Sequence, residues 1–187
     1  VILAFIHSGW LELPSFANTS MNPVSLPTAR DVAHMVEALN RIFCGAYPVN
    51  RQDSEAGIPG VLYGRYKTDA YGGGNPWVLI SAALATLMYQ CAQVVSRSML
   101  MPDELLAWRS ALNAADFGGG SREFLAAGDG ILRRIAHHIL PEDDWHLYEQ
   151  IDKDSGRQYN AKDLTWSYAE VLSALHERSV ALEAQDV

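Results

Sequence analysis

The chain has 187 residues, enough for one domain that buries roughly 70% of its unfolded surface, and its length gives no reason to expect two. Hydrophobic residues make up 49% of it and charged residues 19%, which excludes a disordered, collagen-like or low-complexity chain. The formal net charge of -8 argues against nucleic-acid binding, which needs clustered cations to displace counterions from phosphates. Two cysteines, Cys44 and Cys91, are too few for a disulfide framework or a cysteine-rich zinc site, and they leave the cellular compartment open.

The start of the chain indicates a part of a longer polypeptide. It begins at Val1 with neither methionine nor a basic segment, so the apolar residues 1–6 do not form a secretory signal. These six residues are the only candidate for a short strand, because no other segment alternates convincingly between apolar and polar residues. We therefore expect an all-helical fold.

Two helices are predicted in the first half of the chain. Residues 28–44 carry apolar side chains at helical spacing, and Thr28 and Asp31 form a capping box at the start. A second helix begins near Pro76, extends to about residue 96 and is apolar on nearly every side. It has about the length of a bilayer span, but its polar residues favour a helix buried in a large helical protein over a transmembrane helix.

Three further helices follow. One covers residues 102–115, beginning with a proline and two acids, and the next covers residues 121–139, with the serine at its start as the cap. Gly128 and Gly130 weaken that helix. The last begins at Asp163, where the carboxylate is a candidate N-cap. Its predicted buried stripe consists of Leu164, Tyr168, Val171, Leu172 and Leu175.

Two loops between the helices, residues 64–75 and 144–162, are rich in glycine and in functional side chains. They are either solvated connectors or a site carried on a rigid scaffold. Sugars bind to aromatic faces that cover their C–H surfaces, while Arg, Asp, Glu and Gln satisfy their hydroxyls, so these side chains suit a carbohydrate pocket. The set is Arg65, Tyr66, Asp69, Tyr71 and Trp77 in one loop and Trp145, Tyr148, Glu149, Gln150, Asp152, Trp166 and Tyr168 around the other.

Other chemistries find little support in the sequence. The glycines at 72–74 lack the Lys-Ser/Thr of a phosphate-binding loop and are better read as a flexible turn. The segment that contains Asp152 and Asp154 lacks the glycine and the third acid of a calcium loop. The adjacent His137 and His138 point to different sides of a helix, so they are poor metal ligands. We therefore predict no metal and no cofactor. No nucleophile elbow is present, so covalent acyl transfer finds no support either.

Three stretches match known motifs. Residues 64–77 read Gly-Arg-Tyr-Lys-Thr-Asp-Ala-Tyr-Gly-Gly-Gly-Asn-Pro-Trp, residues 148–153 read Tyr-Glu-Gln-Ile-Asp-Lys, and residues 161–169 read Ala-Lys-Asp-Leu-Thr-Trp-Ser-Tyr-Ala. The first resembles, without a gap, the Gly-Arg-Tyr-Pro-Glu-Asp-x-Tyr-x-x-Gly-Asn-Pro-Trp segment of the glucoamylases, glycoside hydrolase family 15. The others resemble that family's Glu-Gln-x-Asp and Asp-Leu-Thr-Trp-Ser-Tyr-Ala, and residues 2–7 are similar to its Ile-Leu-Ala-Ser-Ile-His.

The resemblance implies a fold and an activity. The family fold is an (α/α)6 barrel of twelve helices in two rings, of which residues 1–187 would be about the C-terminal half. Glucoamylases are inverting exo-hydrolases that cleave α-1,4 and α-1,6 bonds and release β-D-glucose from the non-reducing ends of starch-like glucans. The implied partners are an α-glucan or maltooligosaccharide substrate and the N-terminal half of the same domain, with no nucleic acid and no membrane. A secreted or endomembrane location is implied as well.

The resemblance also assigns roles to residues. Glu149 corresponds to the general base, and Arg65 and Asp69 to residues that hold hydroxyls of the glucose unit nearest the cleavage point. Trp77 and Trp166 correspond to pocket walls, although the sequence alone supports a second packing face for Trp166 equally well. The family's general acid lies in a segment that this chain lacks, so we expect the chain alone to be inactive. The implied substrate-binding residues are Arg65, Asp69, Tyr71, Trp77, Gln150 and Trp166.

Two departures from the pattern bear on the interpretation. Lys67 and Thr68 replace Pro-Glu, which exchanges an acid for a base at the pocket rim, and we expect a difference in chain-length preference or affinity. Related proteins on this fold include trehalose and dextran hydrolases and the regulatory subunits of phosphorylase kinase, whose similar domain has no established hydrolytic role. A non-catalytic regulatory or glycan-binding domain is therefore the alternative, and Glu149 beside Arg65 and Trp77 favours the hydrolase.

Overall fold

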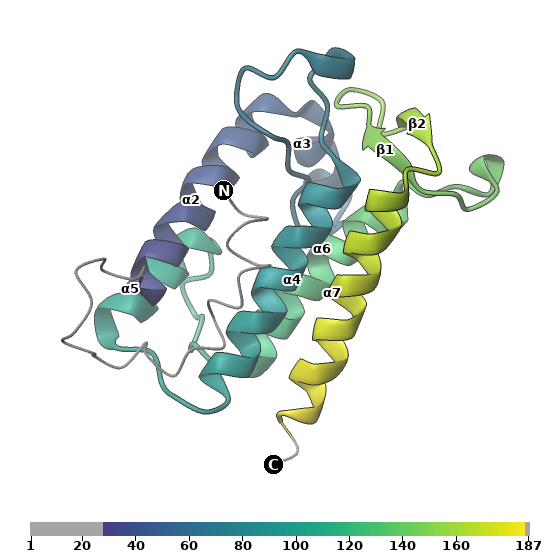
Figure 1. Ribbon diagram of the computed structural model, residues 1–187. Coiled ribbons are helices and arrows are strands. Elements are labelled where there is room, and N and C mark those ends of the chain that lie inside the picture. Colours follow the sequence, from purple (N-terminus) through teal and green to yellow (C-terminus); the bar gives the residue numbers. More distant parts are fainter. Residues whose placement is uncertain (1–27, 186–187) are drawn as a thin grey trace, which may run out of the picture.

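Six α-helices and one two-stranded hairpin make up residues 28–185, the part of the chain that the structure describes (Figure 1). The structure is a computed structural model, and its helices and strands follow one another along the chain with two short 3-10 turns between them. The elements are α2 (Ala29–Ala46), α3 (Pro48–Glu55), η2 (Tyr71–Gly73), α4 (Val78–Val95), α5 (Pro102–Ala111), α6 (Ser121–His137), η3 (Pro141–Asp143), β1 (Tyr148–Ile151), β2 (Gln158–Lys162) and α7 (Thr165–Glu183).

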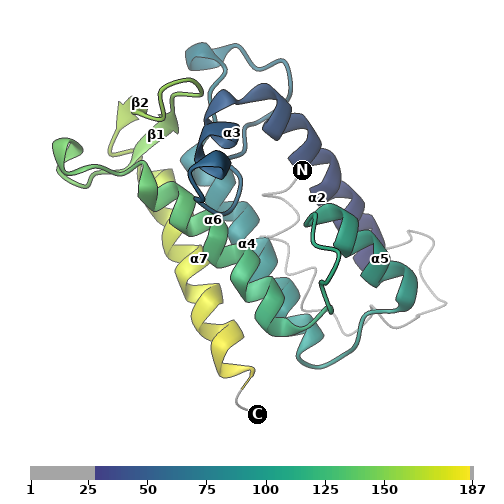
Figure 2. The same cartoon turned by 180° about the vertical axis from the view of Figure 1, so that it is seen from behind.

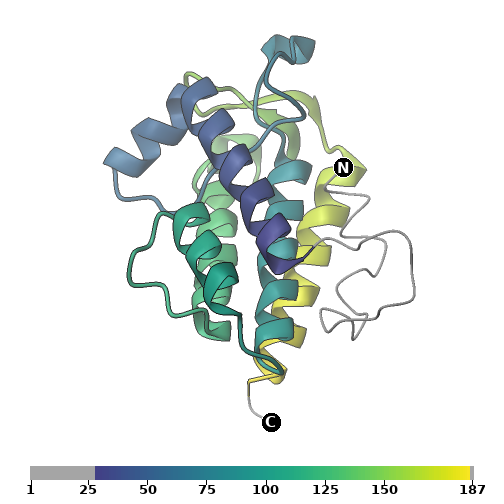
Figure 3. The same cartoon turned by 90° about the vertical axis from the view of Figure 1, so that its left-hand side faces the viewer.

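The helices form two layers. Helix α4 packs against α6 and α7, while α2 packs against α5. Figure 2, seen from behind, shows α4, α6 and α7 running side by side with the hairpin at one end, and Figure 3 shows α2 and α5 on one side of them. The ends of α4 and α7 nearest the hairpin are their N-termini, so the loops that carry the predicted site gather at this end.

Helix α4 is the core of the described structure. Every residue from Val78 to Tyr89 is buried, because α4 has neighbours on more than one side. It is long and apolar enough to cross a membrane, and 72% of it is buried inside the protein, as expected of a core helix. The expected helix therefore exists, but it begins two residues after Pro76.

The first helix has its predicted start. The Thr28 hydroxyl accepts a hydrogen bond from the Asp31 amide at 3.2 Å, and the Asp31 carboxylate accepts one from the Thr28 amide at 2.8 Å, which completes the capping box. At α6 the predicted cap is off by one residue, because Gly120 is the N-cap and Ser121 is the first helical residue.

Two elements contradict the sequence-based expectation. Helix α3 was not predicted, because it is polar overall and buries only Val49, Asn50 and Asp53; its one signal is Pro48 at the first helical position. The hairpin of β1 and β2 also contradicts the expectation that no strand occurs beyond residues 1–6. It is too short and too irregular to show alternation. Residues 1–6 themselves lie outside the described residues.

The glycines in α6 are sites of close packing. A Cβ atom on Gly128 would lie 2.5 Å from the ring of Tyr89 on α4. Gly130 in turn lies against Gly60, whose own Cβ would come within 2.4 Å of the Gly130 carbonyl oxygen. Glycine at these two positions lowers the helix propensity of α6, but it lets α4 and the loop before α4 pack closely against α6.

The predicted buried stripe of α7 is correct in part: Leu164, Tyr168 and Val171 pack against the core, but Leu172 and Leu175 do not belong to the stripe. Leu172 and Leu175 are 64% and 46% exposed, and the residues of α7 that are buried are Ser167, Glu170, Ala174 and Ala181. These are mostly small side chains, which let α7 approach α4 closely. Asp163 is not the N-cap either: its φ is 59°, and the helix starts two residues later, after Leu164.

Candidate active site

The two loops singled out from the sequence meet at one end of the bundle (Figure 1). The segment around η2 leads into α4 and lies beside β1, where Trp77 and Gln150 form an isolated antiparallel bridge. The Ile151 amide donates to the Pro76 carbonyl at 3.0 Å. This backbone pairing places the loop of candidate binding residues next to the strand that carries Glu149.

Arg65 and Asp69 form a bidentate ion pair within the first loop. The Nε and Nη2 atoms of Arg65 donate to the two carboxylate oxygens of Asp69 at 2.7 and 2.6 Å. Asp69 also accepts from the Tyr71 amide at 3.1 Å, and its side chain is 2% exposed. The hydrogen bond from Arg65 is the main cause that lowers the pKa of Asp69, so the pair stays charged.

Three aromatic rings surround the Arg65 guanidinium. Its central carbon lies 4.7 Å from the ring centroid of Trp77, 5.0 Å from that of Tyr71 and 5.5 Å from that of Tyr66. Cation–π contacts of this kind fix a guanidinium in place, so the donors of Arg65 are pre-positioned. Trp77 is buried, and its indole Nε1 finds no acceptor within residues 28–185. Aromatic faces beside a fixed charge pair are the elements of a sugar-binding site.

Glu149 is a buried carboxylate on β1. It is 7% exposed, and burial raises its pKa; the positive charge of Arg65 and a hydrogen bond from Asn160 act in the opposite direction. The Asn160 amide donates to the Oε2 atom of Glu149. A carboxylate with a raised pKa next to a fixed arginine is suited to accept a proton.

The remaining predicted residues lie at different depths. Tyr71 packs against Trp77 with ring centroids 5.7 Å apart and is half exposed. Trp166 lies at the start of α7, also half exposed, and its Nε1 atom donates to the Glu170 Oε1 atom at 2.9 Å. Gln150, by contrast, has no exposed surface at all and bonds to Asn75 beneath the η2 turn.

Comparison with known proteins decides the family. The model of the glycosyl hydrolases family 15 matches residues 12–176. The chain belongs to this family. It is 31% identical over 159 residues to the glucoamylase of Blastobotrys adeninivorans and 34% identical over 155 residues to glucoamylase-1 of Schizophyllum commune. These matches cover 73% and 76% of the chain but 25% and 26% of the relatives, so the chain spans about a quarter of their length.

Solved structures of this family share the fold. The family 15 glucoamylase from Hypocrea jecorina matches with a TM-score of 0.72 at 24% identity, covering 96% of this chain and 31% of that one. The glucoamylase from Saccharomycopsis fibuligera matches with a TM-score of 0.68 at 25% identity, covering 94% and 40%. The predicted fold class is confirmed: the chain is part of the family 15 (α/α)6 barrel.

Sequence reasoning missed two side chains of the candidate site. Asn160 stands beside the candidate base, and Asn75 joins the two loops. The Asn75 position had a signal, because it belongs to the Asn-Pro-Trp of the first motif. Asn160 lies between the second and third motifs, outside the residues that they quote, and the bulge of the hairpin brings it to Glu149.

Two other carboxylates near the site, Asp152 and Asp144, are engaged elsewhere. The Asp152 Oδ1 atom accepts from the Ser155 amide and hydroxyl, both at 2.7 Å, and so holds a turn of the hairpin. Asp144 is exposed, and its carboxylate lies 3.9 Å from the Lys162 Nζ atom. Neither has the buried environment of Glu149.

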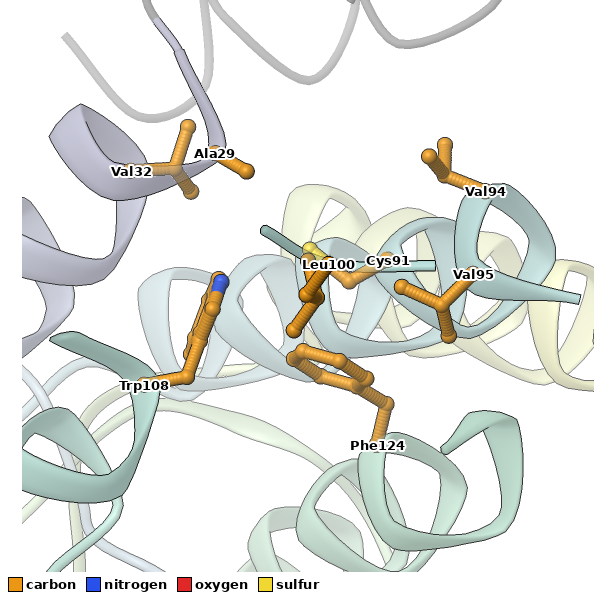
Figure 4. A pocket seen from close by; sticks show the side chains of 8 residues that line it. All are labelled: Ala29, Val32, Cys91, Val94, Val95, Leu100, Trp108 and Phe124. Atoms are coloured by element: carbon orange, nitrogen blue, oxygen red, sulfur yellow. The ribbon is translucent and has the colours of Figure 1, made fainter. Parts of the chain in front are cut away.

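A pocket at the opposite end of α4 has a different chemistry (Figure 4). Burial raises the pKa of the Cys91 thiol there to about 12, so this thiol is not a nucleophile at neutral pH. Among residues 28–185, the side chains that line this pocket are almost entirely apolar and suit no sugar hydroxyl. Its lining residues are Ala29, Val32, Cys91, Val94, Val95, Leu100, Trp108 and Phe124.

Proposed function

We propose that this chain supplies the catalytic base and part of the glucose-binding site of a glucan 1,4-α-glucosidase, a glucoamylase. The substrate is a starch-like α-glucan or maltooligosaccharide, cleaved from its non-reducing end. The observation that carries the proposal is the pairing of a buried, basic carboxylate, Glu149, with the Arg65–Asp69 pair framed by Trp77.

In this proposal Glu149 removes a proton from the attacking water. Its raised pKa strengthens it as a base, while the charge of Arg65 keeps it ionised. Arg65 and Asp69 hold hydroxyls of the terminal glucose, and Trp77 and Trp166 cover its C–H faces. Water attack on the ring face opposite the leaving group inverts the anomeric centre, so β-D-glucose is the first product.

The general acid comes from another part of the domain in this proposal. An inverting pair needs two carboxyl groups about 6.5–9.5 Å apart, one to protonate the leaving oxygen and one to activate water. The proposed source of the acid is the N-terminal part of the same domain, which is also a binding partner of this chain. The solved relatives, of which this chain covers 31% and 40%, support this division.

The test is the Glu149→Gln substitution in the full-length protein. The amide keeps the shape of the side chain but cannot accept a proton, so we expect hydrolysis of maltose to fall by several orders of magnitude while maltose still binds. Polarimetry of the wild-type products should show β-glucose first. A wild-type protein that binds maltose without turnover would establish the non-catalytic glycan-binding alternative instead.

A further inference from the structure

A pair of side-chain amides joins the two loops of the site beneath its surface. The Asn75 Nδ2 atom donates to the Gln150 Oε1 atom at 3.2 Å, and both residues are almost completely buried. Asn75 lies between the η2 turn and α4, and Gln150 directly follows Glu149 on β1. The contact therefore connects the binding loop to the strand of the candidate base.

The orientation of both amides is fixed by backbone groups. The Lys153 amide can only donate, and it lies 3.1 Å from the Asn75 Oδ1 atom. The Gly72 carbonyl can only accept, and it lies 2.8 Å from the Asn75 Nδ2 atom. Since the Nδ2 atom of Asn75 also faces Gln150, the Gln150 atom opposite must be the acceptor Oε1.

The η2 turn lies directly on the Gln150 amide. A Cβ atom on Gly72 would come within 2.6 Å of Gln150 Oε1, and the φ of Gly72 is +59°. The Lys153 Nζ atom donates to the Gly73 carbonyl at 2.9 Å, so the segment after β1 makes a second contact with the η2 turn. The three glycines that the sequence suggested as a flexible turn thus form a closely packed one.

Full burial argues against a direct substrate contact by Gln150. Its side chain has no exposed surface, and its Nε2 atom has no acceptor within residues 28–185. A glucose hydroxyl would have to displace the turn to reach it. The resemblance alone suggested substrate binding for this residue, whereas the burial supports a role underneath the site.

We propose that Gln150 and Asn75 are positioning residues that set the distance between Glu149 and the loop carrying Arg65, Asp69 and Tyr71. The proposal rests on the proposed function, because the geometry it controls is that of base and bound glucose. A misplacement of about 1 Å between reacting groups costs up to about 100-fold in rate. The amide pair is thus a determinant of the rate, without touching the substrate.

The test compares Gln150→Met with wild type in the full-length protein. Methionine keeps the length and burial of the side chain but offers no amide, and we expect a loss of about 10- to 100-fold in kcat/KM for maltose. Gln93→Met is the matched control, because this amide on α4 bonds to Glu177 and not to the turn. The control should keep the wild-type kcat/KM.

Two further measurements separate positioning from contact and from a merely structural role. Maltose analogues that each lack one hydroxyl should all show the same loss in Gln150→Met. Hydrogen exchange of the Lys153 amide, which donates to Asn75, should be faster in this variant. Asn75→Ala combined with Gln150→Met should cost little more than one substitution alone, because both remove the same connection.

Each outcome decides the proposal. Unchanged kcat/KM in Gln150→Met overturns it, and so does a loss that disappears for one particular analogue, since that pattern marks a direct contact. If the wild-type protein releases no glucose, the proposed function fails, and the exchange experiment still applies. Exchange of the Lys153 amide at the wild-type rate in Gln150→Met would then overturn the positioning role.

Discussion

The Asn160 amide donates a hydrogen bond to the Oε2 atom of Glu149 across the hairpin. A bulge makes this possible: Tyr148 pairs with Lys162 and Gln150 with Tyr159, so β2 carries one more residue than β1 at this point. Asn160 adopts a φ of +67°, a conformation that asparagine tolerates better than most residues. Bulges of this kind re-aim side chains next to active sites.

The first prediction concerns the pH dependence of Asn160→Gly in the full-length enzyme. The hydrogen bond from Asn160 lowers the pKa of Glu149, so its loss raises that pKa. The base must be deprotonated to act, and the acidic limb of kcat/KM should therefore move to higher pH. Glycine accepts the left-handed backbone, which separates the loss of the amide from backbone strain.

Asn113→Gly is the matched control for this prediction. Asn113 also has a positive φ, of 50°, but lies between α5 and α6. Its replacement should leave the acidic limb in place. Asn160→Asp adds a like charge beside Glu149 and should move the limb further than glycine does. An acidic limb at the same pH in all three variants would contradict the role of Asn160.

A second prediction tests the bidentate guanidinium contact of Arg65 with Asp69. Arg65→Lys keeps the positive charge but loses the bidentate contact with Asp69 and the stacking on Trp77. We expect a loss of about 1.5–3 kcal/mol in transition-state binding, measured from kcat/KM on maltose. Arg65→Ala should lose at least as much. A lysine variant with full activity would show that only the charge matters.

The third prediction concerns packing between α6 and the loop before α4. Gly60 has a φ of +87° and meets the Gly130 backbone, whereas Gly57 has a φ of +79° and open space around it. Gly57→Ala should cost about 1 kcal/mol from backbone strain alone. Gly60→Ala should cost a further 1–3 kcal/mol, roughly, from overpacking. Urea unfolding of both variants measures the difference, and equal losses would contradict the close contact.

A buried ion cluster joins α3 to α6 and carries the fourth prediction. The Asp53 Oδ2 atom lies 2.9 Å from His138 Nε2 and 3.7 Å from Arg134 Nε, and the Arg134 side chain is 1% exposed. Asp53→Ala leaves that arginine without its carboxylate and should cost about 3–5 kcal/mol in the free energy of unfolding. Glu55→Ala, in the exposed pair with Arg51 on the same helix, should cost about 0.3–0.5 kcal/mol.

The sequence predicted the elements whose signals come from residues close together in the chain. The capping box of Thr28 and the apolar run of α4 depend on nearby residues, and both were found as expected apart from the exact ends. The inner face of α7 depends on its neighbour, because a closely packed α4 selects small residues such as Ala174 rather than Leu172. Size alone therefore placed Leu172 and Leu175 wrongly in the buried stripe.

The residues of the candidate site also fall into two groups, those that sequence motifs predicted and those that depend on contacts between distant segments. Glu149, Arg65 and Trp77 lie in motifs that resemble the family's, and the structure places their loops side by side. The contact of Asn160 with Glu149 depends on a bulge in a hairpin that no alternation revealed. The depth of Gln150 depends on the turn packed over it, which is a property of two segments that are distant in the sequence.

The last prediction concerns residues 1–187 expressed alone. Helix α4 is buried within residues 28–185, so its apolar side chains do not provide a surface for association. The exposed apolar side chains include Leu172, Leu175 and Leu182, which share one side of α7 and form a surface that favours association. We expect light scattering to show oligomers, and fewer of them in Leu172→Lys. We also expect no release of glucose from maltose or starch, because the general acid is proposed to lie elsewhere. A monomer with turnover would show that a second carboxylate in this chain acts as the acid.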